Sequence, residues 1–202
     1  GLRMVSIQHY GTSSYAHGTG TEGGLLPRAK PLLDALKDSG IIVDMTHATD
    51  QGFWETLDAY GGPRCASHHN CRELVPGQRQ LTDDMIKAIA ERGGVVGTAF
   101  DAWMLDPSWD REKPCYEQRT QATLETVVDH IDHISQLLGN CTHSGIGTDL
   151  DGGFGQEQSP NDLNTITDLN RLPEILDKRG YSSADVDNVL HGNWVRFLKE
   201  CW

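Results

Sequence analysis

The sequence lacks the features that mark several large classes of protein. No apolar run approaches the roughly 20 residues needed to span a bilayer, and no basic, apolar leader opens the chain. No CxxC pair occurs, and the cysteines are odd in number: Cys65, Cys71, Cys115, Cys141 and Cys201. Neither a disulfide framework nor a cysteine zinc site is indicated, so we expect reduced thiols in a cytoplasmic protein. A leader peptide upstream of Gly1 would overturn this prediction of the compartment.

Basic residues are scarce. The chain has 17 Lys and Arg against 29 Asp and Glu, which gives a formal net charge of -12. This balance disfavours binding to nucleic acid or to an anionic membrane, because both depend on basic surface. A small molecule or a peptide is the better substrate class. The length of 202 residues and the 37% hydrophobic content predict a single folded domain over residues 1–202.

Several catalytic motifs are also missing. There is no HExxH, no GxSxG and no Walker-type glycine loop, so zincin, α/β-hydrolase and phosphate-loop interpretations lack support. Binuclear barrels bridged by a carbamylated lysine need a lysine at a strand end. All six lysines fall instead in predicted helices or loops: Lys30, Lys37, Lys87, Lys113, Lys178 and Lys199.

Strand and helix patterns alternate along the chain, which is typical of a parallel sheet with crossover helices. The clearest helix carries an apolar stripe from Leu124 to Leu138 and ends at Gly139. Asp50 and Thr82 are the expected N-caps of two earlier helices. Strands are predicted at 4–9, 41–46, 63–67, 95–100 and 143–148, and helices near 27–39, 53–57, 85–91, 124–138, 165–178 and 183–199.

Five βα units could form an open doubly wound sheet or part of a (βα)8 TIM barrel of the metal-dependent hydrolase type. The barrel is favoured because closure directs the ends of distant strands at one axis, whereas an open sheet keeps them apart. Such barrels typically have about 250 residues, so about three units would be missing. The chain also begins at Gly1 directly before a strand. We therefore expect it to be the carboxyl-terminal part of a longer protein.

Three of the predicted strands end in an acid or an imidazole. His47 and His68 end consecutive strands, so both can reach one cation, with zinc favoured at about 2.0 to 2.1 Å. Asp149 ends an almost side-chain-free strand, where small residues would leave room for a substrate, and a carboxylate near a metal can move protons. Asp151 precedes Gly152 and is interpreted as a turn residue. His69 should point to the opposite side of its strand.

Two further residues have weaker signals. His9 ends the first strand and could donate a hydrogen bond to an oxyanion, and Arg79 precedes a helix and could bind a carboxylate bidentately. Alone, His9 is weak evidence for a site, and Arg79 would be better interpreted as a solvated loop arginine. His130 and His133 are assigned to the solvent-facing side of an amphipathic helix. No role is assigned to His17, His143 or His191.

Six segments together resemble the membrane (renal-type) dipeptidase family in order and spacing over essentially the whole chain. They are IIVDMTHAT (41–49), ASHHN (66–70), RQLTDD (79–84), GGVV (93–96), GIGTDLDG (145–152) and GNWVR (192–196). The resemblance implies a zinc-dependent (βα)8 barrel that hydrolyses dipeptides, often with a D-residue at the carboxyl end, by attack of a metal-bound hydroxide. A homodimer is a further expectation.

The resemblance also implies a role for each matched residue. His47 and His68 would bind one zinc, His9 would contact the substrate carbonyl, Arg79 would bind the substrate carboxylate and Asp149 would be the catalytic acid and base. The family's other zinc takes a His-x-Asp pair from the first strand, and a glutamate bridges both metals. Neither occurs here, so only half of a two-zinc site is expected in this chain and the rest before Gly1.

Two alternatives remain open at this stage. One keeps the barrel and changes the reaction to hydrolysis of another amide. The other is a non-catalytic fragment with an incomplete metal site, because two histidines without a bridging carboxylate make a poor binuclear centre.

Overall fold

The computed structural model describes residues 1–202, and strands alternate with helices in the expected order. The strands are β1 (Met4–Val5), β2 (Ile42–Asp44), β3 (Arg64–Cys65), β4 (Val96–Thr98) and β5 (Ser144–Ile146). The α-helices are α1 (Ala29–Asp38), α2 (Asp50–Ala59), α3 (Asp83–Ala90), α4 (Ala102–Leu105), α5 (Leu124–Leu138), α6 (Leu172–Lys178), α7 (Ser183–Asp187) and α8 (Asn193–Cys201). All five strands are shorter than predicted.

Every strand pair in the sheet is parallel. Strands β1, β2 and β3 form one ladder, and β4 pairs with β5 in a second. An isolated parallel bridge between Ala66 and Val96 joins the two ladders, so the strands follow one another in chain order. Residues 1–202 therefore have an α/β fold with an open parallel sheet, and this chain by itself does not close a barrel.

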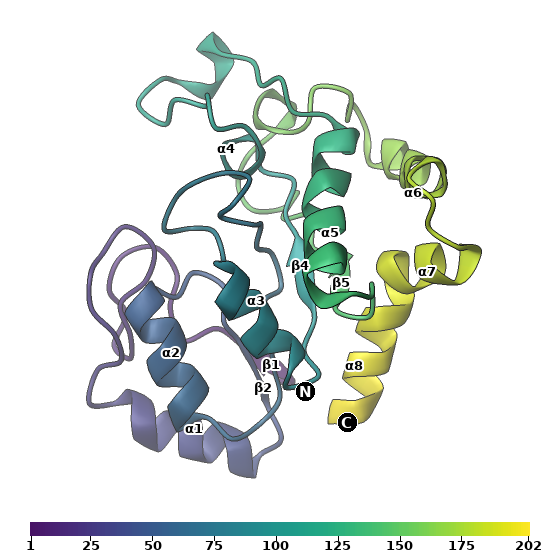
Figure 1. The fold of residues 1–202 in the computed structure, drawn as a ribbon. Coiled ribbons are helices and arrows are strands. Elements are labelled where there is room, and N and C mark those ends of the chain that lie inside the picture. The colour runs from purple at the N-terminus through teal and green to yellow at the C-terminus, as the bar shows by residue number, and fades with distance from the viewer.

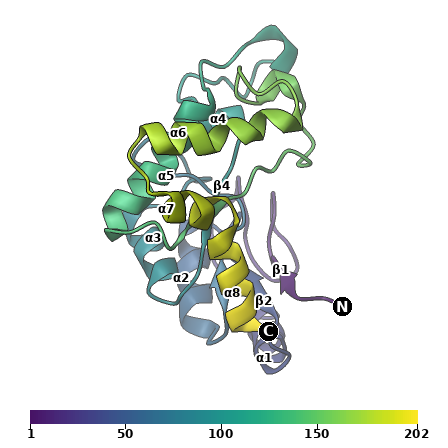
Figure 2. The ribbon, with the colours of Figure 1, turned by 90° about the vertical axis from the view of Figure 1, so that its right-hand side faces the viewer.

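Helices cover both faces of the sheet (Figures 1 and 2). Side chains of α1, α2, α3 and α5 share one buried cluster with Val43 and Val96. On the other face, Phe197 of α8 packs with Ile42 and Cys65. Adjacent residues of β2 thus face opposite layers, as the two-residue period of a strand requires. The two termini lie close together, with the Arg3 guanidinium 5.8 Å from the ring centre of Trp202.

Helix α5 has the bounds that its apolar stripe predicts. Its residues Leu124, Val127 and Ile131 are buried with Leu172 and Leu176 of α6 in a second core cluster. Gly139 ends the helix in the left-handed conformation at φ 70°, where a residue without Cβ has no steric penalty.

One of the two predicted helix N-caps is confirmed and the other is wrong. The Thr82 hydroxyl accepts a hydrogen bond from the Met85 N–H and caps α3, as predicted. Helix α2 is capped by Thr49 rather than by Asp50, because the Thr49 hydroxyl accepts from the Gly52 N–H at 2.9 Å. Asp50 lies in the first turn, and its carboxylate accepts from Arg72 at 2.6 Å.

The last predicted helix is divided into α7, a π-helical turn at Asn188–Gly192, and α8. After this turn, the Asn193 amide donates to the carbonyl oxygens of Cys141 and Ser144 at 2.7 and 2.8 Å. The Trp194 indole donates to the Ile146 carbonyl at 3.0 Å. The GNWVR segment thus anchors α8 to β5.

The solvent-facing assignment of His130 is wrong. Its side chain is 1% exposed, and its Nδ1 atom accepts a hydrogen bond from the Cys71 N–H at 3.1 Å. His133 is partly buried, with Nε2 2.7 Å from an Asp83 oxygen. The helical stripe could not reveal this, because α3 and the chain around Cys71 cover the polar side of α5. Burial, together with His133, lowers the pKa of His130 to about 3.

We expect this histidine to make the fold sensitive to acid. The unfolded chain binds more protons than the folded chain between the folded pKa of about 3 and the ordinary value of 6.5. The free energy of unfolding should therefore fall as the pH drops through this window, by up to about 1.4 kcal/mol per pH unit from this group. Denaturant unfolding of the protein and of His130→Asn from about pH 7 to pH 4 measures it.

The asparagine oxygen can accept the same N–H without titrating, so His130→Asn should lose less stability on acidification. Exposed His191→Asn is the matched control and should follow the parent curve. If the pH curves of His130→Asn and the parent are parallel, the neutral buried imidazole has no such effect.

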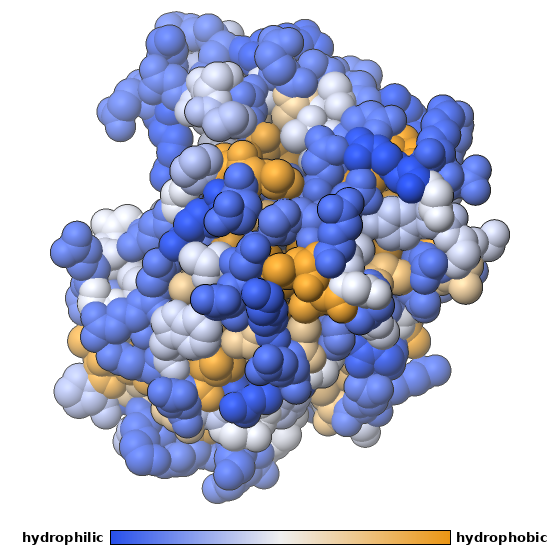
Figure 3. Space-filling model, viewed as in Figure 1, coloured by the Kyte–Doolittle hydropathy of each residue, from blue (hydrophilic) through white to orange (hydrophobic).

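No helix is both long and apolar enough to cross a bilayer. Hydrophilic residues dominate the face drawn in Figure 3, and the hydrophobic residues on it form separate patches.

Candidate active site

The carboxyl ends of β2, β3 and β5 bring three predicted site residues together. The Nε2 atoms of His47 and His68 lie 3.4 Å apart, and Nε2 of His68 is 3.9 Å from a carboxylate oxygen of Asp149. His68 and Asp149 follow strands that are separated by β4. The sheet must therefore curve strongly at this end.

Two glycines allow this curvature. A Cβ atom at Gly97 or Gly147 would lie 2.1 or 2.0 Å from the Ser67 carbonyl oxygen. That carbonyl, at the end of β3, lies directly over β4 and β5. The sequence predicts room for a substrate beside Gly147. This prediction is wrong, because backbone fills that space.

The backbone at this end of the sheet is also strained. His47 and Asp149 are the only non-glycine residues with positive φ, at 67° and 59°. Left-handed conformations cost a non-glycine residue of the order of 1 kcal/mol or more and cluster at functional sites. The strain thus coincides with two residues that the sequence selects for chemistry.

A hydrogen-bonded chain orients His68. The Ser67 hydroxyl donates to the Asp44 carboxylate and lies 2.8 Å from Nδ1 of His68. Because that hydroxyl has given its one proton to Asp44, it accepts from an Nδ1–H of the imidazole. The lone pair of His68 is then on Nε2, which faces His47. The Thr46 hydroxyl also donates to Asp44, at 2.7 Å, so this carboxylate links the residues that follow β2 and β3.

His47 is held in a similar way. Its Nδ1 atom lies 3.0 Å from the Thr19 hydroxyl, and the residue is 4% exposed. Burial, helped by the Arg79 charge and by His9 and His68, lowers the pKa of His47 to about 2. Burial and Arg79 also lower the pKa of His68, although Asp149 and Asp44 act in the opposite direction. Both imidazoles are therefore neutral at pH 7, which is the form that binds metal.

The histidine pair fits one zinc ion. Two nitrogens bonded to a tetrahedral zinc at about 2.05 Å would lie about 3.3 Å apart, and the two Nε2 atoms are 3.4 Å apart. Each ring also has a hydroxyl at its other nitrogen, as metal-binding histidines usually have an outer hydrogen-bond partner. No third His, Cys, Asp or Glu of this chain completes a three-ligand cluster.

His9 and Tyr10 lie against this pair. The His9 ring centre is 4.2 Å and the Tyr10 ring centre 4.9 Å from that of His47. The Thr19 N–H donates to the His9 carbonyl at 2.9 Å, so the loop that supports His47 also holds His9. Both His9 and Tyr10 are exposed and so accessible to a substrate.

Arg79 is buried, which its loop position did not predict. It is 2% exposed, and its Nη2 atom donates to the His68 carbonyl at 3.0 Å, while its Nη1 atom has no partner. Burial lowers the pKa of Arg79 to about 10, and the nearby Tyr10 and Asp149 oppose this shift. A buried guanidinium with a free N–H suits a carboxylate ligand.

Asp151, His69 and Asp101 also follow the ends of strands in this sheet. Asp151 is exposed in the turn after Asp149 and makes no hydrogen bond. His69 is fully buried, with an unpaired Nδ1, and burial lowers its pKa well below 6.5. Asp101 is buried at the end of β4, accepts from Gln158 at 2.8 Å and has a pKa raised mainly by burial.

Sequence reasoning missed the supporting residues Thr19, Asp44, Ser67, Tyr10 and Asp101. Asp44 and Ser67 had a usable signal, because Asp44 lies three residues before His47 and Ser67 directly precedes His68. Thr19 had none, since 28 residues of sequence separate it from its partner His47.

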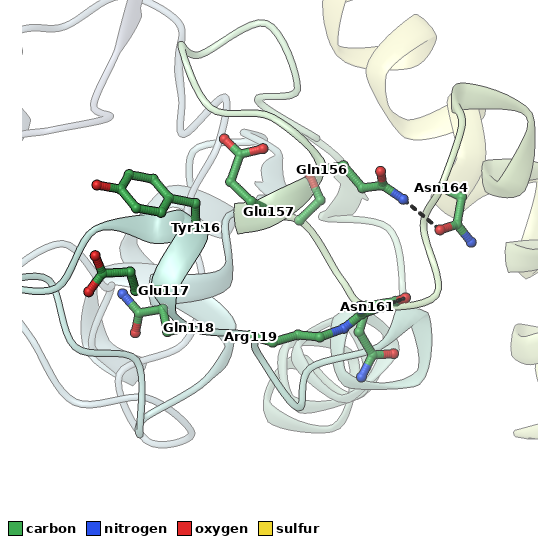
Figure 4. A pocket seen from close by; sticks show the side chains of 9 residues that line it. Tyr116, Glu117, Gln118, Arg119, Gln156, Glu157, Asn161 and Asn164 are labelled. Carbon is green, nitrogen blue, oxygen red and sulfur yellow. Dashed lines mark hydrogen bonds between the residues drawn. The ribbon is translucent and has the colours of Figure 1, made fainter.

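A cavity of about 700 Å³ lies elsewhere, between the turns at Cys115–Glu117 and Gln156–Gln158. Figure 4 shows its polar lining, with Gln156 hydrogen-bonded to Asn164. None of the strand-end residues lines it.

Neutral imidazoles and a carboxylate gathered at the carboxyl ends of parallel strands are the arrangement of a metal-dependent α/β hydrolase. The sequence specifies the family. The chain belongs to the membrane dipeptidase family (peptidase family M19), whose family model matches residues 1–201.

Individual proteins are also similar to this chain in sequence. The chain is 31% identical over 182 residues to an uncharacterized protein of the pqqA 5' region of Klebsiella pneumoniae, covering 90% of this chain and 63% of that protein. Dipeptidase tcpJ of Claviceps purpurea is 27% identical and matches 99% of this chain, which covers 45% of it.

A solved structure matches the whole chain. It is a metallo peptidase of Rhodobacter sphaeroides with a phosphinate mimic of the dipeptide L-Ala-D-Ala, and it is 26% identical to this chain with a TM-score of 0.87. The match covers 100% of this chain and 56% of that one. The chain thus spans about half the length of its relatives.

Proposed function

We propose that the protein is a zinc-dependent dipeptidase in which His47, His68 and Asp149 lie at the reacting bond. The observation that carries the proposal is the pair of neutral imidazoles with Nε2 atoms 3.4 Å apart, beside a carboxylate 3.9 Å from His68. Membership of a dipeptidase family supports the substrate class. The substrates are dipeptides, including those with a D-residue at the carboxyl end.

In this proposal His47 and His68 hold the metal through Nε2. Zinc, when bound, would polarise the scissile carbonyl and lower the pKa of a water molecule. Asp149 accepts a proton from the attacking water and delivers it to the nitrogen of the leaving amine. The C–N bond breaks as the new C–O bond is completed, so the products are two free amino acids.

His9 and Arg79 position the substrate. His9, exposed beside the His47 ring, donates a hydrogen bond to the carbonyl oxygen as negative charge develops on it. The unpartnered Nη1 of Arg79 binds the carboxylate of the dipeptide, which holds the reacting carbonyl next to the histidine pair.

We further propose that the sheet is part of a (βα)8 barrel to which residues 1–202 contribute five βα units. The five strands are parallel and follow one another in chain order, as in such a barrel. Strand β1 pairs only with β2, and β5 only with β4, so each has a free edge for a further strand.

Hydrolysis of L-Ala-D-Ala and L-Ala-L-Ala by the purified protein tests the function. We expect release of free alanine that stops when a chelator removes the metal and returns when zinc is added, because the histidine pair then regains its ligand. The control substrate is an N-acetylated amide that is not a dipeptide. Zinc-loaded protein that cleaves only the N-acyl amide, or nothing, contradicts the proposal.

A further inference from the structure

A second pocket adjoins the candidate active site. It has a volume of about 250 Å³, and its walls include the aromatic side chains of Tyr10, Trp103 and Trp109. Arg111, Lys113 and Gln158 also line it, and no acidic residue does. This is unusual in a chain of net charge -12, in which Asp and Glu outnumber Lys and Arg.

Arg111 is an exposed residue whose guanidinium lies over an aromatic ring of this pocket. The central carbon of its guanidinium lies 3.8 Å from the ring centre of Trp103 and 6.0 Å from that of Tyr10. It makes no hydrogen bond or ion pair with the rest of the chain, whereas Lys113 is 3.6 Å from an Asp110 oxygen. A guanidinium that stacks through its face keeps its N–H edges free for a planar, bidentate ligand. Carboxylates are ligands of this kind.

Two contacts connect this pocket to the reacting groups. Tyr10 contributes to the pocket wall, and its ring centre is also 4.9 Å from that of His47. Gln158 lines the pocket and donates at 2.8 Å to Asp101, the buried carboxylate that follows β4. A substrate bound at His47 and His68 can therefore extend a side chain past Tyr10 toward Arg111.

We propose that this pocket binds the side-chain carboxylate of an acidic dipeptide, one that contains Asp or Glu. The inference rests on the proposed dipeptidase function and specifies its substrate. The aromatic walls contact the methylene groups of the side chain, and Arg111 binds its carboxylate. Arg79 is then reserved for the main-chain carboxylate, so the two arginines bind different groups of one substrate.

Matched pairs of substrates test the inference. Ala-Glu and Ala-Gln, and Glu-Ala and Gln-Ala, differ only in the charge of one side chain. We expect kcat/KM to be about tenfold higher for the acidic member of at least one pair, and Arg111→Gln to abolish that preference while changing the amide substrate less than about threefold. Arg111→Lys should retain only part of the preference, since a lysine is not a planar fork.

Arg28→Gln is the matched control, because Arg28 is exposed and makes no hydrogen bond or ion pair. Its replacement removes the same charge as Arg111→Gln does. It should keep the preference. Equal kcat/KM values within both pairs, or a preference that survives Arg111→Gln, would overturn the inference while alanine dipeptides are still cleaved. If no dipeptide is cleaved, calorimetric binding of the same four dipeptides decides it: equal affinities overturn the inference, and an Arg111-dependent affinity for the acidic members supports it.

Discussion

Replacement of Asp149 by asparagine is expected to lower kcat for dipeptide hydrolysis by about 10²- to 10⁴-fold, the contribution typical of a positioned acid and base. Asparagine has the same shape but cannot accept and return a proton. It also tolerates the left-handed conformation at φ 59° that residue 149 adopts. The fold should therefore be preserved, and steady-state kinetics with L-Ala-D-Ala measure the effect.

Asp151→Asn is the matched control, two residues away in the same loop. Asp151 is exposed and makes no hydrogen bond, so its replacement should leave kcat within about twofold of the parent value. Similar kcat values for Asp149→Asn and Asp151→Asn would show that Asp149 is not the catalytic acid and base. A circular dichroism spectrum and a thermal unfolding curve verify that both variants are folded.

His47→Asn is expected to weaken zinc binding by at least about 100-fold, more than the loss of an outer hydrogen-bond partner typically costs. Only one of the two imidazoles 3.4 Å apart would then remain. Asparagine again suits the backbone, because residue 47 has φ 67°. Competition with a chromophoric chelator measures the affinity directly and does not depend on activity.

Exposed His191→Asn makes the same chemical change far from the strand ends in sequence and should bind zinc like the parent. His68→Asn should weaken zinc binding as His47→Asn does, because each of the two rings contributes one ligand. Unchanged zinc affinity in either site variant would refute the metal assignment, and dipeptide hydrolysis by that variant would show that the reaction does not need the pair.

Local sequence patterns were sufficient for the order of the strands and the longer helices, but they did not predict the short α4. The stripe from Leu124 to Leu138 predicts α5 with its observed bounds, and Gly139 ends it as a left-handed cap. These predictions succeed because helical periodicity and glycine conformation depend on neighbours along the chain. The strands were placed correctly and drawn too long, since the polar residues that end them resemble continuing strand in sequence.

The candidate site was predictable in its residue types and not in its support. A histidine at the end of a buried strand is visible in the sequence, so His47 and His68 could be selected. Thr19, the partner of His47, lies 28 residues away along the chain, and a hydrogen bond between segments so far apart leaves no local pattern. The burial of His130 and Arg79 was missed for the same reason.

The sequence by itself determined that strands alternate with helices and that imidazoles and a carboxylate end three strands, because both follow from residue type and spacing. Only the tertiary structure decided that these ends meet. The Ser67 carbonyl must approach Gly97 and Gly147 more closely than any Cβ would permit. That contact between three strands curves the sheet and brings His68 within 3.9 Å of Asp149.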